Sequence, residues 1–266
     1  NFHQVSQINL SPDFIECIVF WTKNAVPFMD YLEELNRMGY MYMFQYTITP
    51  YDNTLEKNIS DKSDIIKNVL ELSEKIEKKR IVWRYDPILL NDTYTVNRHI
   101  ELFEEMCSLL YTAVNHVVIS FIDLYQKNRG YRLYELSTDE ITHLAQAFGE
   151  IGAKYKLPIK TCCENYDLTK FGITKGACID SVLLEEICNR PLLLKKATGQ
   201  RKNCLCAESV DIGAYHTCLN GCIYCYATDY KRLKTKQKCY DKNSQILCDK
   251  LDFGKDIIKV RKMKKL

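Results

Sequence analysis

The sequence predicts an α/β fold in which repeated strand–helix units build a parallel sheet. Short apolar runs of strand length alternate along the chain with longer segments whose apolar residues recur at helical spacing. The chain has 266 residues and is 46% hydrophobic, which is enough for one large core. Because strand–helix–strand connections are right-handed, consecutive strands are expected to lie parallel, in a doubly wound sheet or in part of a barrel.

Five buried strands are predicted before Cys204. Each is a short apolar run, and the first reads Cys-Ile-Val-Phe-Trp. The third is expected to stop at Asp86-Pro87. The predicted strands cover residues 17–21, 42–48, 80–85, 116–122 and 159–163.

Five helices are predicted between and after these strands. The first is expected to end before Gly39, a typical residue just past a helix end. Ser137 and Glu140 have the spacing of a capping box, which predicts a helix start at this point. The predicted helices cover residues 27–37, 62–78, 96–113, 138–155 and 181–188.

Polar residues recur just after the strand ends, and this recurrence favours a TIM-like barrel, incomplete or circularly permuted, over a doubly wound sheet. In a parallel barrel these ends share the face on which sites form. Turns and helix caps use the same residue types, so ordinary loop chemistry is the alternative. The residues are Thr22, Lys23, Asn24, Thr47, Thr49, Tyr51, Arg84, Asp86, Asp123, Tyr125 and Glu164.

Four of these residues are candidate catalytic residues. Arg84 and Asp86 could hold the carboxylate, amine or ribose of a small-molecule cofactor, because Arg pairs bidentately with carboxylates, or they could form a strand-end ion pair. Asp123 and Glu164 could bind polar groups or handle protons, although Asp123 could instead cap a turn. The candidate cofactor-binding residues after the first strand are Thr22, Lys23 and Asn24.

Charge and cysteine usage divide the chain into three predicted parts. Residues 231–266 carry 13 Lys/Arg against 4 Asp/Glu, a basic tail that could bind nucleic acid or be a solvated terminus. Residues 1–200 are the expected barrel body and residues 201–230 a cysteine-rich segment. Thirteen cysteines in a long chain without a membrane span or signal peptide favour a cytoplasmic protein with thiols free for metal.

The cysteine-rich segment contains Cys218, Cys222 and Cys225, with the spacing C-x3-C-x2-C. Gly221 allows a tight turn, and three nearby thiolates suit an iron–sulfur cluster or zinc. Three ligands leave one iron of a 4Fe–4S cluster open to another molecule, whereas structural zinc is usually closed by four. Unmetallated thiols are the remaining alternative.

A fourth ligand could come from nearby in the sequence. Cys204 or Cys206 could close an iron–sulfur cluster, and either of them or His216 could complete a zinc site. The C-x-C pair could also act as redox thiols, and the spacing alone does not separate these alternatives.

The cysteine loop, with Tyr224 before its last cysteine, resembles the signature of radical S-adenosylmethionine enzymes. The run Cys-Ile-Tyr-Cys-Tyr-Ala at 222–227 is similar to the loop of spore photoproduct lyase. More of the chain resembles an uncharacterised bacterial family, domain of unknown function 1848. The stretches that carry this resemblance are 19–24, 83–88, 161–164, 178–180 and 211–215.

The radical-enzyme resemblance implies a 4Fe–4S cluster on the three loop cysteines, S-adenosylmethionine as cofactor, and Tyr224 near the cofactor. No Gly-Gly-Glu-like stretch, which often marks methionine binding in such enzymes, is present. Members of the uncharacterised family are expected to begin with a strand that carries a Ser-Arg-Arg-Thr-Asp-like segment, and this segment is absent here.

The cysteine loop lies near the end of this chain, whereas in most radical S-adenosylmethionine enzymes it follows the first strand. Residues 210–215 are predicted to form a strand that leads into the loop, with a polar helix from Lys231, as in a circular permutation. We therefore expect a radical S-adenosylmethionine-like enzyme. The alternatives are an accessory or electron-transfer iron–sulfur protein with a closed cluster, and a zinc-stabilised module that binds nucleic acid. An electron-donor protein and nucleic acid are the expected candidates for a macromolecular partner.

Overall fold

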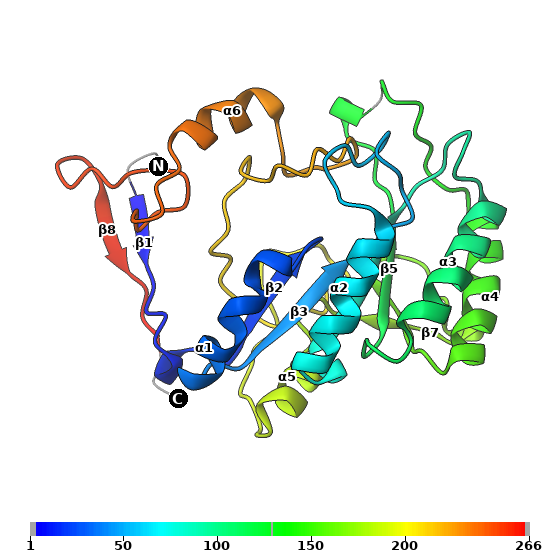
Figure 1. Cartoon of the computed structure of the whole chain (residues 1–266), viewed down its shortest axis with the longest axis horizontal. Helices are drawn as coiled ribbons and strands as arrows, with labels where there is room; N and C mark the ends of the chain where they lie inside the picture. The colour runs from blue at the N-terminus through cyan, green and yellow to red at the C-terminus, as the bar shows by residue number, and fades with distance from the viewer. Residues whose placement is uncertain (1–3, 129, 264–266) are drawn as a thin grey trace. The chain divides into compact units, whose positions relative to one another are not determined.

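The computed structural model describes residues 4–128 and 130–263 (Figure 1), and the chain divides into two compact units. The sheet unit comprises Cys17–Asp52 and Ser60–Ser209. The loop unit comprises the described parts of Asn1–Glu16, Asn53–Ile59 and Val210–Leu266. Cys204 and Cys206 therefore belong to the sheet unit, and the three cysteines of the C-x3-C-x2-C motif belong to the loop unit.

The sheet unit contains a parallel sheet of six strands in the order β2-β3-β4-β5-β6-β7. This confirms the α/β fold and the five predicted strands, and it adds β7. Among the described residues β2 and β7 are the two edges, and no closed barrel is seen. The strands are β2 (Ile18–Thr22), β3 (Tyr42–Thr47), β4 (Ile81–Ile88), β5 (Val117–Phe121), β6 (Ile159–Cys162) and β7 (Ile173–Gly176).

The sequence predicted that the third strand stops at Asp86-Pro87, and this prediction is wrong, because β4 continues to Ile88. The register between β4 and β5 shifts after Tyr85, and pairing resumes where Ile88 lies opposite Phe121. The proline lies within this irregular stretch, where its missing N–H removes no ladder hydrogen bond. The strand therefore continues to Ile88 and carries Asp86 within it.

Among its described residues the sheet unit has five α-helices, close to the predicted positions. The predicted first helix is split, because Val26–Tyr31 forms a 3₁₀ segment before α1. The Ser137–Glu140 capping box is present, with both reciprocal hydrogen bonds. The helices are α1 (Leu32–Arg37), α2 (Lys62–Lys75), α3 (Val96–Leu110), α4 (Thr138–Tyr155) and α5 (Ser181–Cys188).

The two faces of the sheet pack differently, because side chains alternate along each strand. On one face Trp83 stacks on Phe103 of α3, and Phe103 stacks on Phe148 of α4, so α3 and α4 cover this face side by side (Figure 1). On the other face Met43, Val82 and Val118 form a core with three apolar residues of α5. Those residues are Leu183, Leu184 and Ile187.

The face that packs on α5 becomes polar toward the carboxyl ends of its strands. Gln45 and Arg84 follow Met43 and Val82 by two residues, and Ser120 follows Val118 by two, so all three point to the same face. Cys162 also belongs to this face, since it lies two residues after Lys160, the partner of Val118. The fold thus collects polar and thiol side chains at the carboxyl ends of the strands, and we call this region the polar edge of the sheet.

The loop unit contains little regular structure. Strand β1 (Gln4–Gln7) pairs in parallel with β8 (Ile257–Val260), and the predicted polar helix is present as α6 (Tyr230–Lys238). The predicted strand at 210–215 is wrong. Asp211 Oδ1 accepts a hydrogen bond from Gly213 N–H at 2.8 Å, so this segment begins with a turn. Ile212 and Tyr215 are exposed, so burial does not favour a strand here.

No helix in the described ranges is long and apolar enough to cross a membrane.

Candidate functional site

A buried ion pair lies at the centre of the polar edge of the sheet. Arg84 is 5% exposed, and its guanidinium bonds to the Asp86 carboxylate through Nη2. Its Nη1 lies 3.3 Å from Gln45 Oε1 and 3.1 Å from Cys178 Sγ. Burial alone would raise the pKa of Asp86, but the charge of Arg84 and the hydrogen bonds to the carboxylate outweigh it and lower the pKa. Arg84 and Asp86 are thus a pre-formed charged pair.

Ser120 belongs to the candidate site, although it was not among the residues predicted from the sequence. Its hydroxyl donates a hydrogen bond to the second oxygen of Asp86, so Arg84 and Ser120 hold this carboxylate from two sides. Gln45 was not predicted either. Each of the two is a polar residue inside an apolar run of a buried strand, and this exception to the apolar pattern was the signal that could have identified them.

Glu164 lies just beyond β6, as predicted, and its carboxyl has an unusual proton affinity. Burial raises its pKa to about 7; the Phe121 N–H, which donates to Oε1 at 2.9 Å, lowers the pKa, and the charges of Asp123 and Asp86 raise it. A carboxyl group with this pKa can exchange a proton near neutral pH. Glu164 is therefore the best-placed proton carrier at this edge.

Asp123 lies in a different environment. It forms an ion pair with Arg201 at 2.8 Å, and both side chains are more than half exposed. The same guanidinium lies 3.3 Å from the Tyr125 hydroxyl. The structure therefore gives Asp123 a solvent-exposed ion pair, and Arg201 was not among the predicted site residues.

Thr22 and Asn24 build the turn after β2. Thr22 Oγ1 accepts from Asn24 N–H at 2.9 Å, and Asn24 Oδ1 accepts from Val26 N–H at 2.9 Å. Both contacts are ordinary turn chemistry, the alternative considered for the strand ends. Lys23 Nζ instead lies 3.4 Å from Thr49 Oγ1, so it bridges the ends of β2 and β3.

A group of thiols borders the Arg84–Asp86 pair. Cys162 Sγ lies 2.8 Å from Cys178 Sγ, and Cys206 Sγ accepts a hydrogen bond from Cys178 N–H at 3.2 Å. The hydrogen bond from the Cys178 thiol lowers the pKa of Cys206 to about 5 against the effect of burial, with help from backbone N–H groups and Cys204. Burial raises the pKa of Cys204. Both predicted fourth ligands thus have partners inside the sheet unit.

The cysteine loop of the loop unit is held by the short segment Asn53–Ile59. Ile223 N–H donates to Leu55 O at 3.0 Å, and Asn58 N–H donates to Asn220 O at 3.0 Å. The Asn58 side chain adds a hydrogen bond to Leu219 O at 2.6 Å. These bonds fix the backbone on both sides of Gly221, and no sequence motif pointed to this segment.

Gly221 is required where the loop turns. Its φ is +73°, a conformation that side chains rarely adopt. A Cβ atom at this position would lie 3.1 Å from Lys57 Cβ and 3.2 Å from Asn58 Nδ2. The turn between Cys218 and Cys222 therefore depends on the missing side chain.

Tyr224 faces inward rather than toward solvent. It is 8% exposed, and its hydroxyl donates a hydrogen bond to the carboxylate of Glu56, which is 1% exposed. His216 is also occupied, because its Nδ1 accepts a hydrogen bond from Asp229 N–H at 2.9 Å. Both side chains support the loop.

The donor set of the loop fits an iron–sulfur cluster in its chemistry. Cys218 is exposed, Cys222 and Cys225 are partly exposed, and all three are soft sulfur donors. Across residues 4–128 and 130–263, no three His, Cys, Asp or Glu side chains are arranged around a common point where a metal ion would fit. Metal binding by this loop would therefore require its thiols to converge.

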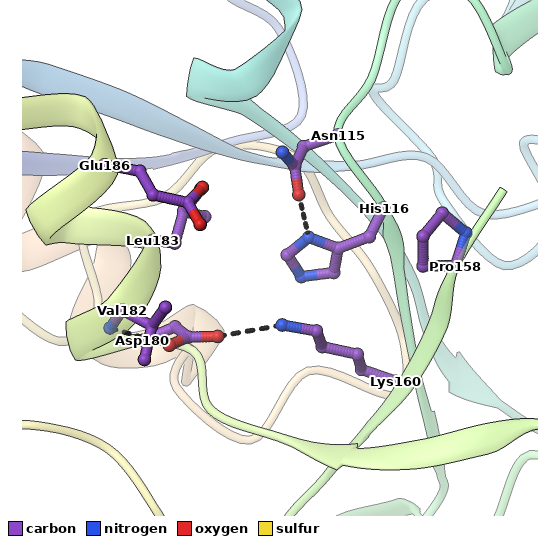
Figure 2. A pocket seen from close by; sticks show the side chains of 8 residues that line it. All are labelled: Asn115, His116, Pro158, Lys160, Asp180, Val182, Leu183 and Glu186. Atoms are coloured by element: carbon purple, nitrogen blue, oxygen red, sulfur yellow. Dashed lines mark hydrogen bonds and ion pairs between the residues drawn. The ribbon is translucent and has the colours of Figure 1, made fainter.

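A pocket of about 350 Å³ opens between α5 and the amino-terminal ends of β5 and β6 (Figure 2). The buried His116 places Nδ1 2.6 Å from Asn115 Oδ1, and burial lowers its pKa to about 3, with a further lowering by Lys160. Lys160 and Asp180 form an ion pair at 2.8 Å along the wall. None of the site residues predicted from the sequence lines this pocket.

One comparison with known proteins gives a match. The family model described as "Domain of unknown function (DUF1848)" matches residues 1–227, which is most of the chain. No curated protein and no solved structure matches the sequence.

Proposed function

We propose that this chain, which belongs to the DUF1848 family, binds a 4Fe–4S cluster through Cys218, Cys222 and Cys225. The observation that carries the proposal is the backbone frame of the loop. Hydrogen bonds from the Asn53–Ile59 segment hold residues on both sides of Gly221, while the three cysteines stay at least partly exposed. A loop held by its backbone leaves its thiols available for ligands.

Three ligands fit this loop better than four. The predicted fourth thiols, Cys204 and Cys206, are engaged within the sheet unit, and His216 uses Nδ1 inside its own loop. With three thiolates, one iron stays open, which supports an iron–sulfur cluster over a closed zinc site. The resemblance of the loop to radical S-adenosylmethionine enzymes makes S-adenosylmethionine the proposed small-molecule cofactor.

The order of the strands supports an incomplete barrel as the body of the enzyme. All six strands of the sheet are parallel and follow one another in chain order, without the reversal that a doubly wound sheet requires. Right-handed crossovers in this order place the connecting helices on one face, as α3 and α4 are placed. The opposite face would then be the inner face of the barrel.

We propose that the inner face binds the substrate at its polar edge. Arg84 and Asp86 would hold polar groups, and Glu164 would accept or donate a proton at neutral pH. A 4Fe–4S cluster held by Cys218, Cys222 and Cys225 would, once reduced, supply one electron to the small-molecule cofactor. An electron-donor protein that reduces the cluster is the implied partner. The residues of the sheet unit would position the substrate.

The test is spectroscopic and uses the full chain purified without oxygen. We expect a broad visible absorption that bleaches on reduction and a low-temperature paramagnetic signal that shifts when S-adenosylmethionine is added. Cys225→Ser should lose both signals, whereas Cys239→Ser, at the end of α6 and outside the motif, should keep them. A cluster whose signal does not shift would indicate a closed cluster and an electron-transfer role, against the enzyme proposal.

A further inference from the structure

We infer that Cys162 and Cys178 form a reversible disulfide, which makes the polar edge of the sheet a thiol–disulfide exchange site for small-molecule disulfides. This site lies wholly in the sheet unit and goes beyond the proposed cluster. Its basis is a contact between the sulfur at the end of β6 and a sulfur in the segment just after β7, beside a buried cation.

The geometry of the two cysteines suits a disulfide. Cys162 ends β6 and pairs with Gly176 of β7, and Cys178 follows Gly176 by two residues. Their sulfurs are 2.8 Å apart, and a disulfide bond is about 2.05 Å long, so less than about 1 Å of movement joins them. Both side chains are partly exposed, so a small reagent can reach them.

The same distance argues against a shared zinc ion. Zinc–sulfur bonds of about 2.3 Å in a tetrahedral site hold their sulfurs about 3.8 Å apart. The sulfurs of Cys162 and Cys178 are 1 Å closer than this, at 2.8 Å. The absence of any group of three metal-binding side chains in the described ranges agrees with this comparison.

The exchange needs only the two thiols and one small-molecule disulfide as the oxidant. The Cys162 sulfur attacks one sulfur of the reagent, which forms a mixed disulfide and releases the first reagent thiol. The Cys178 sulfur then attacks Cys162, which forms the internal disulfide and releases the second reagent thiol. The two cysteine protons end on the two released thiols, the cysteines lose two electrons, and the reagent gains them.

Arg84 couples this exchange to the ion pair. Its Nη1 lies 3.1 Å from Cys178 Sγ, so its positive charge stabilises negative charge that develops on this sulfur during the exchange. A disulfide sulfur is a weaker hydrogen-bond acceptor than the thiol sulfur that Arg84 contacts in the reduced protein. Oxidation therefore frees an Arg84 donor beside Asp86, and the redox state of the cysteines changes what this edge can bind.

The experiment uses the full chain equilibrated with a series of glutathione disulfide to glutathione ratios. Free thiols are then alkylated in acid-quenched samples, and the digested protein is analysed by mass spectrometry. We expect a peptide pair linked through Cys162 and Cys178, lighter by two hydrogen atoms than the reduced pair, which increases with the ratio and reverses on reduction. Cys162→Ser and Cys178→Ser should abolish the link, whereas Cys163→Ser, the adjacent cysteine, should keep it.

Two measurements keep this test independent of the cluster and of folding. The wild-type chain alone decides whether the link forms, so a variant that fails to fold does not affect the result. The link should also form in the Cys218→Ala/Cys222→Ala/Cys225→Ala variant, in which the proposed cluster is lost. Full alkylation of Cys162 and Cys178 at every ratio, a link from Cys178 to Cys206 instead, or zinc released by Cys178→Ser would overturn the inference.

Discussion

The hydroxyl of Tyr224 donates a hydrogen bond to the carboxylate of Glu56, a residue 168 positions earlier in the chain, and both side chains are buried. This contact joins the cysteine loop to the segment that holds its backbone. The tyrosine before the last cysteine therefore has a structural task in this chain, and the cofactor role that the resemblance implies stays a prediction.

Tyr224→Phe should loosen the cysteine loop without unfolding the sheet unit. Loss of one partner of a buried hydrogen bond costs about 1–3 kcal/mol, which corresponds to roughly 5- to 150-fold more frequent local opening. Hydrogen exchange at Ile223 N–H, which is bonded to Leu55 O, should accelerate by this factor. Tyr240→Phe, at an exposed position of the same unit, is the control, and equal exchange rates in the two variants would contradict the structural role.

Arg84→Met should destabilise the sheet unit strongly, because it leaves the Asp86 charge largely buried without its partner. Breaking a buried ion pair on one side typically costs about 3–5 kcal/mol. Arg98→Met breaks the exposed Arg98–Glu101 pair and should cost less than about 1 kcal/mol. Urea unfolding of both variants checks the difference, and Arg84→Met/Asp86→Asn should recover part of the loss. Equal midpoints for the two single variants would contradict the burial of the Arg84 charge.

Glu164 should titrate near neutral pH, because burial raises the pKa of its carboxyl to about 7. Carbon-detected magnetic resonance of chains labelled at the glutamate carboxyl should show one group that changes its shift around pH 7. This group should be absent from Glu164→Gln, which keeps an oxygen to accept from Phe121 N–H. A Glu164 carboxyl that titrates at its ordinary value near pH 4.5 would exclude a proton-carrying role at neutral pH.

Two buried histidines should make the sheet unit sensitive to acid. Burial lowers the pKa of His99 to about 4 and that of His116 to about 3, whereas an unfolded histidine titrates near 6.5. Well above pH 6.5 both histidines are neutral in the folded and in the unfolded state, so they do not change the free energy of unfolding. As the pH falls below 6.5, the histidines bind protons in the unfolded state but stay neutral in the folded state. The free energy of unfolding therefore decreases by about 2 kcal/mol for each histidine at pH 5.

The measurement compares urea midpoints at pH 7.5 and pH 5. His116→Gln should lose part of the difference between the two midpoints, whereas His143→Gln, at an exposed position of α4, should keep all of it. A His116→Gln variant whose difference between the two midpoints equals that of the wild type would show that His116 accepts a proton in the folded state.

Local patterns were enough to predict most of the sheet unit. The five strands and the start of α4 follow from apolar runs and a capping box, because strand burial and helix capping depend on neighbouring residues. Strand β7 was missed because its four residues, Ile-Thr-Lys-Gly, contain one apolar side chain and take their strand structure from pairing with β6. The prediction of a strand at 210–215 was wrong because the side chain of Asp211 forms a turn with Gly213 N–H, and no strand pairs with this segment in the described ranges.

The candidate site depends on contacts between distant residues, and only half of it was visible in the sequence. Arg84, Asp86 and Glu164 were found because charged groups stand out next to apolar strands. Cys178 was not among the predicted site residues, yet its sulfur contacts both Cys162 and Arg84. The support of the cysteine loop by Asn53–Ile59 has no local signal, since those residues gain this role only when the chain folds.

The most direct test of the central claim is iron, sulfide and zinc analysis of the anaerobically purified chain beside the Cys218→Ala/Cys222→Ala/Cys225→Ala variant. We predict about four irons and four sulfides per chain, the content of one 4Fe–4S cluster, and their loss in the variant. Near-stoichiometric zinc without sulfide would contradict the proposed cluster and would identify the loop as a zinc site.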